Sequence, residues 1–163
     1  MSAGVRRLAR LSCLTAVALA LCWLEVFLPL PLPLPGVKLG LANLASVYAL
    51  YRMGAREALW VSLARILLAA FLFGSLFSAA YALCGALCAL SAMALARRAG
   101  CFSVFGVSMG GAVAHNAAQL LLAAGIARTG DLLAYLPALL LCGLATGWLI
   151  GLLAERLLRT RLP

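Results

Sequence analysis

Long apolar stretches separated by short polar turns run through almost the whole chain. A helix needs roughly 20 mainly apolar residues to cross a bilayer. On this criterion the pattern predicts six spanning helices, of which the second is short. Their expected ranges are residues 8–28, 39–51, 57–73, 77–96, 103–126 and 132–156. We therefore expect an all-α polytopic membrane protein that forms one integral membrane domain over residues 1–163.

A proline-rich segment separates the first two predicted helices. Pro29, Pro31, Pro33 and Pro35 alternate with leucine, and Gly36 closes the run. Proline at every second position excludes a helix and favours an extended backbone. Because such a backbone leaves its polar groups unsatisfied in lipid, the segment is expected to be a loop that packs against the helices.

Composition supports the membrane assignment, since 66% of the 163 residues are apolar and only 10% are charged. The basic residues then indicate the orientation, because cytoplasmic loops are rich in arginine and lysine. Only Lys38 and Arg128 lie on one predicted side. The opposite side carries Arg6, Arg7, Arg10, Arg52, Arg56, Arg97, Arg98, Arg156, Arg159 and Arg161. This asymmetry predicts a plasma-membrane protein with both termini in the cytoplasm.

The net charge, the cysteines and the N-terminal segment do not indicate any other class of protein. The net charge of +9 is spread between apolar stretches and not gathered in one arm, so no nucleic-acid partner is expected. The six cysteines form no C-x-x-C pair and are interpreted as apolar filler, so neither a metal site nor a cofactor is predicted. A retained first helix is favoured over a cleaved signal peptide, because the small residues lie inside the first apolar run and not after it.

Four polar residues interrupt the third and fifth predicted helices. Arg65 lies about halfway along the third, where a charge costs about 2.5–3.5 kcal/mol on insertion scales. It therefore needs a partner or water, and it either forms a structural ion pair, snorkels to water, or receives an anionic group of a ligand. His115, Asn116 and Gln119 belong to one five-residue stretch of the fifth predicted helix. They are either packing residues or contacts to a ligand.

Three further polar residues lie near the predicted outer ends of the first two helices. Glu25 ends the first, while Lys38 and Asn43 flank the start of the second. Depth along the helices places all seven groups in the middle or outer half of the membrane. We expect them to surround one outward-facing pocket for a small molecule, in which Glu25 neutralises Arg65 while the site is empty.

Several segments resemble a known bacterial family. They are Glu25 to Asn43 with the run Gly36-Val37-Lys38-Leu39-Gly40-Leu41-Ala42-Asn43, Arg65 followed by Gly74, and Ser108 to Gln119 with its His-Asn-x-x-Gln pattern. Over nearly the whole chain the sequence resembles the Gx transporter family, which is also catalogued as heptaprenyl diphosphate synthase component I.

That family is in turn similar to the substrate-binding S components of energy-coupling factor transporters. The resemblance implies a six-helix S-component-like bundle that captures a small organic substrate. It also implies a transmembrane coupling protein and ATPase subunits as partners, with Ala16 and Ala20 as the docking surface on the first helix.

Three functions remain open. The leading hypothesis is a substrate-capture subunit of an importer, which must rely on a partner ATPase because the chain has no phosphate loop. The second is an accessory membrane subunit in heptaprenyl diphosphate synthesis. Catalysis by the chain itself is not expected, because its only aspartate is Asp131 and diphosphate chemistry needs clustered oxygen ligands for magnesium. The third is a structural scaffold. Basic and amide side chains favour a ligand with a carboxylate or phosphate, without identifying it.

Overall fold

The computed structural model describes residues 2–27 and 39–160, and this part of the chain contains helices and turns but no strand. The proline-rich segment and Lys38 lie outside the described residues, so the predictions made for them stay predictions. The helices are α1 (Ala3–Val26), α2 (Leu41–Arg52), α3 (Ala55–Phe73), α4 (Leu76–Ala99), α5 (Val104–Ala127), the 3₁₀ helix η1 (Asp131–Tyr135) and α6 (Leu136–Arg159).

Serine caps explain why several helices begin where they do. Ser2, Ser75 and Ser103 precede α1, α4 and α5, and each hydroxyl accepts a hydrogen bond from the backbone amide three residues later. Such a cap satisfies one of the amides that a helix start leaves without a partner. Because of the Ser2 cap, α1 begins at Ala3 and includes the first arginines, whereas hydropathy alone predicted a start at residue 8.

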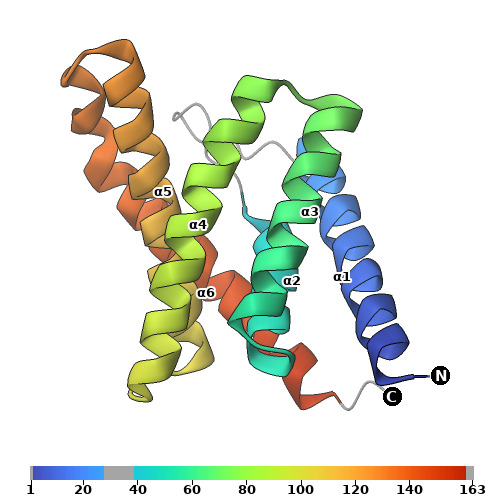
Figure 1. Ribbon diagram of the computed structural model, residues 1–163. Helices are drawn as coiled ribbons and strands as arrows, with labels where there is room; N and C mark the ends of the chain where they lie inside the picture. The colour runs from blue at the N-terminus through green and yellow to red at the C-terminus, as the bar shows by residue number, and fades with distance from the viewer. Residues whose placement is uncertain (1, 28–38, 161–163) are drawn as a thin grey trace.

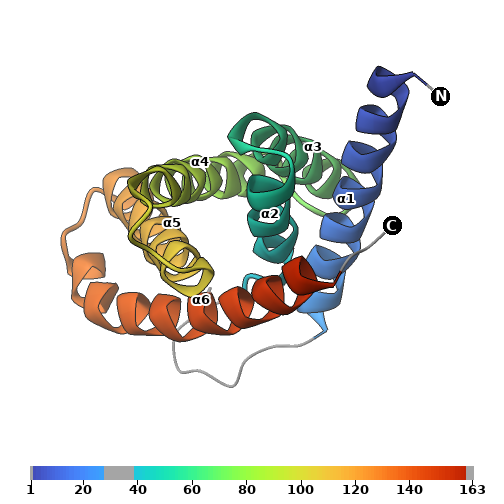
Figure 2. The same ribbon diagram turned by 90° about the horizontal axis from the view of Figure 1, so that it is seen from below.

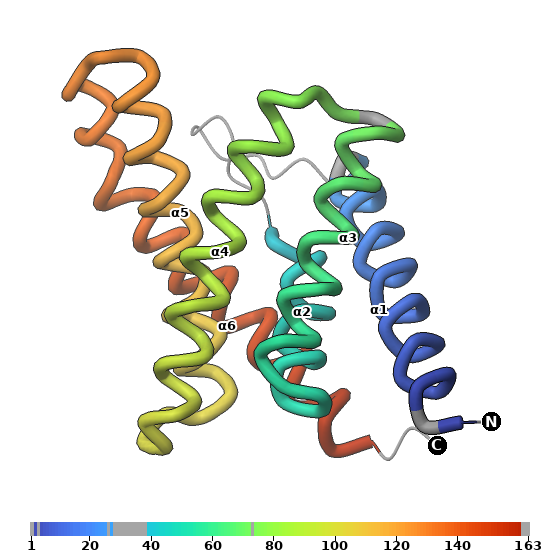
Figure 3. The backbone as a smooth tube through the Cα atoms, viewed as in Figure 1, coloured from blue at the N-terminus to red at the C-terminus, as the bar shows by residue number. Residues whose placement is uncertain are grey.

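The six α-helices form two groups of three. Helices α1, α2 and α3 pack against one another, while α5 lies between α4 and α6. The groups meet where α3 contacts α4 and where α2 contacts α6 and α4 (Figures 1 and 2). The start of α1, the end of α6 and the α2–α3 and α4–α5 turns all lie at one end, which is the lower end in Figure 3. We call it the arginine end, because most of the arginines lie in these segments.

Three of the described helical segments are long and apolar enough to cross a membrane: Gly4–Glu25, Leu76–Ala99 and Asp131–Arg159. The outer surface fits lipid contact, since large side chains such as Phe71 (88% exposed) and Leu76 (89% exposed) stand away from the protein. The expected six helices are present, but six membrane crossings are not established. Helix α2 has only 12 residues, or about 18 Å at 1.5 Å per residue, against a hydrocarbon core about 30 Å thick.

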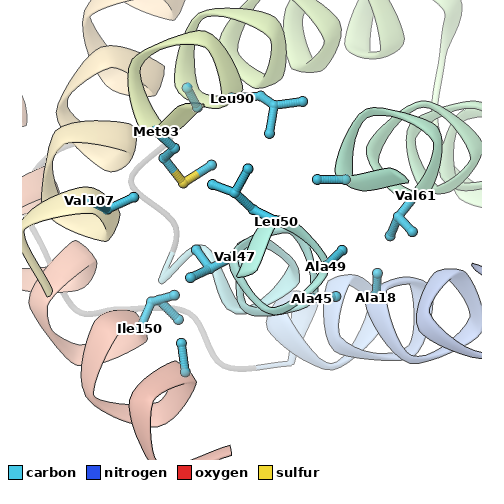
Figure 4. Close-up of a cluster of buried hydrophobic side chains, with 13 residues drawn as sticks. Ala18, Ala45, Val47, Ala49, Leu50, Val61, Leu90, Met93, Val107 and Ile150 are labelled. Atoms are coloured by element: carbon cyan, nitrogen blue, oxygen red, sulfur yellow. The ribbon is translucent and has the colours of Figure 1, made fainter. Parts of the chain in front are cut away.

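A small apolar core closes the arginine end of the bundle. Val47 and Leu50 of α2 meet Met93 of α4, Val107 of α5 and Ile150 of α6 (Figure 4). All five are at most 3% exposed, and each belongs to the half of its helix nearer the arginine end. The core therefore separates that end from the space between the opposite halves of the helices.

Glycines let α6 approach α5 closely. A Cβ atom added at Gly147 would lie 2.7 Å from Met109 Cα, and one added at Gly151 would lie 2.8 Å from Phe105 Cα. Both neighbours are backbone atoms, which cannot rotate away. The four-residue glycine spacing therefore marks a helix–helix contact, as in other small-residue interfaces.

Two arginines stabilise helix ends at the arginine end. Arg97 of α4 donates to the carbonyl oxygens of Leu50 and Tyr51 in the last turn of α2. Arg52 donates from Nη2 to Leu158 O at 2.9 Å, at the end of α6. The last carbonyl groups of a helix have no N–H donor within their own helix and carry partial negative charge. A guanidinium at that end supplies both the missing hydrogen-bond donors and a compensating positive charge. These arginines thus connect helices, in addition to the part they have in the predicted orientation.

Both termini are expected to be cytoplasmic. Single cysteines introduced at Gly4 and Thr160, in a background where exposed native cysteines are replaced, should resist a membrane-impermeant thiol reagent in intact cells and react after lysis. A cysteine introduced at Arg128, beyond the opposite end of α5, serves as the positive control. Reaction of either terminal site in intact cells would rule out this orientation.

Candidate ligand-binding cavity

A cavity of about 510 Å³ lies among all six α-helices, with Val47, Met93 and Ile150 of the apolar core contributing to its wall. Six of the seven predicted site residues line it, and the seventh, Lys38, lies outside the described residues. The six are Glu25, Asn43, Arg65, His115, Asn116 and Gln119. Glu25 and Gln119, which are 94 residues apart in the sequence, thus line the same cavity. Whether they bind a ligand stays a prediction.

Arg65 is the most unusual residue of the cavity. It is the eleventh of the 19 residues of α3 and is 8% exposed. Its Nε is buried without a hydrogen bond, and no ion pair to Arg65 exists within residues 2–27 and 39–160. A guanidinium keeps its charge in any protein, and a buried charge is costly unless it is paired. The cavity therefore contains a buried cation whose charge no carboxylate of the described residues neutralises.

Glu25 has a different role from the one predicted. Its Oε1 accepts hydrogen bonds from the backbone amides of Gly40 and Leu41, the latter at 3.3 Å, at the start of α2. It does not neutralise Arg65, so that prediction is wrong for this structure. The physical reason is that a helix start offers free amides and partial positive charge to a nearby carboxylate. Glu25 thus ties the far end of α1 to the start of α2.

The polar residues of α5 reach into the cavity from between its two neighbours. Asn116 donates from Nδ2 to Leu139 O of α6 at 2.9 Å, and Gln119 donates from Nε2 to Tyr81 O of α4 at a longer 3.5 Å. Each amide therefore uses one N–H to fix its own position. The second N–H and the carbonyl oxygen of each amide stay available for another partner.

His115 is seated against a glycine that sequence reasoning missed. A Cβ atom added at Gly85 of α4 would lie 2.7 Å from His115 Cε1 and 3.0 Å from Gln119 Cγ. Gly85 therefore makes room for both side chains. Its only sequence signal is a glycine inside an otherwise apolar helix, and that signal does not say which neighbour needs the space.

Further lining residues were also missed by sequence reasoning. Phe77 and Tyr81 of α4 stack with ring centroids 6.3 Å apart, and both line the cavity. Asn43, one of the predicted residues, lines it from the first turn of α2, near the backbone amides that Glu25 accepts from. The cavity thus combines one cation and several amides with aromatic and aliphatic walls, which is the usual composition of a small-molecule site.

The predicted docking residues lie on the opposite face of α1 from the bundle. Ala16 and Ala20 are exposed, whereas Thr15 and Ala18 are buried. The face that carries the two alanines is therefore free for contact with lipid or with another protein. Its role in docking remains a prediction.

The described part of the chain contains no group of three or more histidine, cysteine, aspartate or glutamate side chains that could hold a metal ion. The fold and cavity together define a class: an α-helical protein with a lipid-compatible exterior and a largely apolar cavity, into which polar side chains project and whose arginine has no ion-pair partner among the described residues.

Comparison with known proteins then identifies the family. The sequence model for heptaprenyl diphosphate synthase component I matches residues 14–157, so the chain belongs to that family, as the sequence resemblance predicted. No match was found among curated proteins or among solved structures. The family description agrees more directly with the accessory-subunit hypothesis than with the importer hypothesis.

Proposed function

We propose that this protein is a membrane-embedded binding subunit that holds a small anionic molecule in the cavity around Arg65. The observation that carries the proposal is the 8% exposed guanidinium of Arg65, which lines a mostly apolar cavity and has no ion-pair partner within residues 2–27 and 39–160. A structural scaffold would gain nothing from this arrangement, because replacing an unpaired buried charge with an apolar side chain removes a desolvation cost.

The ligand is expected to be a small amphipathic anion. Its carboxylate or phosphate would pair with Arg65, since the planar guanidinium can give two parallel hydrogen bonds to either group. The amide oxygens of Asn116 and Gln119 would accept hydrogen bonds from the polar part of the ligand. The rings of Phe77 and Tyr81 would cover its apolar part. A volume of about 510 Å³ lies within the range of 300–1,000 Å³ typical of small-molecule sites.

The first candidate setting is an importer, in which the subunit captures its ligand from outside in the manner of an S component. A transmembrane coupling protein and ATPase subunits would then supply the energy. The exposed Ala16–Ala20 face supports this candidate, because small residues at four-residue spacing allow another helix to approach closely.

The second candidate setting is heptaprenyl diphosphate synthesis, which the family description favours. Here the protein would be the membrane component beside a separate catalytic synthase subunit, and Arg65 would hold a diphosphate group. Both settings use the same cavity and the same cation. They differ in the ligand and in the partner.

Mass spectrometry of small molecules that remain bound through purification tests the shared proposal and separates its two settings. We expect one anionic compound at close to one equivalent per chain, displaced by mild heating. A polar carboxylate or phosphate compound would support the importer, and a prenyl diphosphate would support the synthase component. A protein that is empty after mild purification, and that gains no thermal stability from any of a panel of carboxylates, phosphates and prenyl diphosphates, would contradict the proposal.

Large side chains on the exposed face of α1 should separate binding from docking. In Ala16→Leu and Ala20→Leu variants, ligand binding should persist because neither residue lines the cavity. Association with a coupling protein should fall by about tenfold or more, since the helices can no longer approach closely. Val17→Leu, on an exposed position of α1 without this spacing, is the matched control. Normal uptake and complex formation in both alanine variants would refute the docking assignment.

A further inference from the structure

A second cavity, unrelated to the ligand cavity, lies at the arginine end. Its volume is about 470 Å³, and it is lined by Arg6, Arg7 and Arg10 of α1, Arg52 and Met53 at the end of α2, and Glu57 of α3. We call it the arginine cleft. Four guanidinium groups and one carboxylate give it a net charge of +3.

Two of these arginines are positioned by the fold. Arg7 Nη2 forms a 2.5 Å ion pair with Glu57 Oε1, and Arg52 is held by carbonyls at the end of α6. Arg10, by contrast, makes no hydrogen bond or ion pair within the described residues. Among the described lining residues one carboxylate faces four guanidinium groups, so this lining carries an excess of positive charge that an anion could compensate.

The surroundings of the cleft match a lipid better than a freely soluble anion. On α3, Trp60, Leu67 and Phe71 follow Glu57 at helical spacing, and they are 52%, 67% and 88% exposed. This apolar stripe runs from the cleft toward the opposite end of the helix. A molecule with a phosphate in the cleft would therefore place any attached acyl chains against apolar surface.

We propose that the arginine cleft binds the phosphate headgroup of an anionic phospholipid. Arginine gives paired hydrogen bonds to phosphate oxygens, and basic pockets between membrane helices are suited to acidic headgroups. The lipid would bridge α1 to the α2–α3 turn, and its acyl chains would lie along Trp60, Leu67 and Phe71. This proposal is independent of what the ligand cavity holds.

Thermal unfolding of the purified protein in detergent, with increasing phosphatidylglycerol or phosphatidylcholine, tests the proposal. We expect a saturable rise in Tm with phosphatidylglycerol only. Each basic residue near a lipid surface contributes about 1 kcal/mol. Arg10→Gln should therefore raise the half-saturating lipid concentration about fivefold, and Arg6→Gln combined with Arg10→Gln about thirtyfold. Arg128→Gln, at the opposite end, should leave it unchanged.

Three results would overturn the proposal. The first is an equal rise in Tm with both lipids. The second is the same stabilisation from inorganic phosphate at matched ionic strength, which would indicate a soluble anion. The third is a doubly substituted protein that keeps its response to phosphatidylglycerol but loses association with an acidic protein partner, which would make the cleft a protein-docking surface. Unchanged Tm without lipid and a monodisperse elution profile would show that the variants remain folded.

Discussion

Replacing Arg65 with methionine should abolish ligand binding and leave the empty protein at least as stable as before. Loss of one partner from a buried charge pair costs about 2–5 kcal/mol, which corresponds to a loss of affinity of about 30-fold to several thousand-fold. In the empty protein the same side chain is buried without an ion-pair partner among the described residues, so an apolar replacement removes a desolvation cost. Ligand retention and Tm, measured on the same preparation, report the two effects.

A loss of ligand binding together with an unchanged or raised Tm would distinguish a ligand-binding role of Arg65 from a structural one. If Arg65 were part of a structural ion pair, Arg65→Met would lower Tm because it would leave a buried carboxylate unpaired. Arg65→Lys is the graded control, because it keeps the charge but loses paired hydrogen bonds, and it should bind at intermediate strength. Full uptake or ligand retention by Arg65→Met would mean that the cavity residues are structural. Asn116→Ala is expected to differ, since it also breaks the bond to Leu139 and should lower Tm.

The level of each polar residue along its helix was enough to predict which residues would meet. Arg65 and Gln119 lie at similar depths on helices that run in the same direction, and both line one cavity. The prediction worked because polar side chains in lipid are forced toward a shared polar space. Depth does not, however, fix rotation about the helix axis or the choice between donors. For this reason the sequence did not predict that Glu25 accepts hydrogen bonds from the amides of Gly40 and Leu41 instead of pairing with Arg65. Nor did it predict that Gly85 makes room for the side chains of His115 and Gln119.

Hydropathy alone does not establish how many of the six helices cross the membrane. Helix α5 is 24 residues long, but it contains His115, Asn116 and Gln119, which lower its mean hydropathy. Helix α3 carries Arg65 together with Arg56 and Glu57 near its start. These residues line the cavity or lie near a helix end, so they need not contact lipid even where the helix crosses the membrane. Polar residues that a helix contributes to the cavity thus make the helix harder to recognise as a membrane crossing, and among the described residues only Gly4–Glu25, Leu76–Ala99 and Asp131–Arg159 stand out by length and apolarity.

Adding one methyl group at Gly151 should destabilise the protein, although alanine is the better helix former. In an open helix position, Gly→Ala is favourable by about 1 kcal/mol. At Gly151 the new Cβ would lie 2.8 Å from Phe105 Cα, so α5 and α6 would have to move apart. Overpacking of this kind costs about 1–3 kcal/mol, and it outweighs the gain in helix propensity because the obstacle is backbone. Gly151 does not line the ligand cavity, so the effect on folding is separable from any effect on the ligand site.

Gly110→Ala is the matched control for this prediction. Gly110 lies on α5, and a Cβ added there meets nothing within 4 Å. The same chemical change should therefore leave stability unchanged or raise it by up to about 1 kcal/mol. Thermal or denaturant unfolding of the two variants in the same detergent should shift in opposite directions. Equal shifts would mean that α5 and α6 do not meet backbone to backbone at Gly151, and the close contact that positions Asn116 against α6 would lose its support.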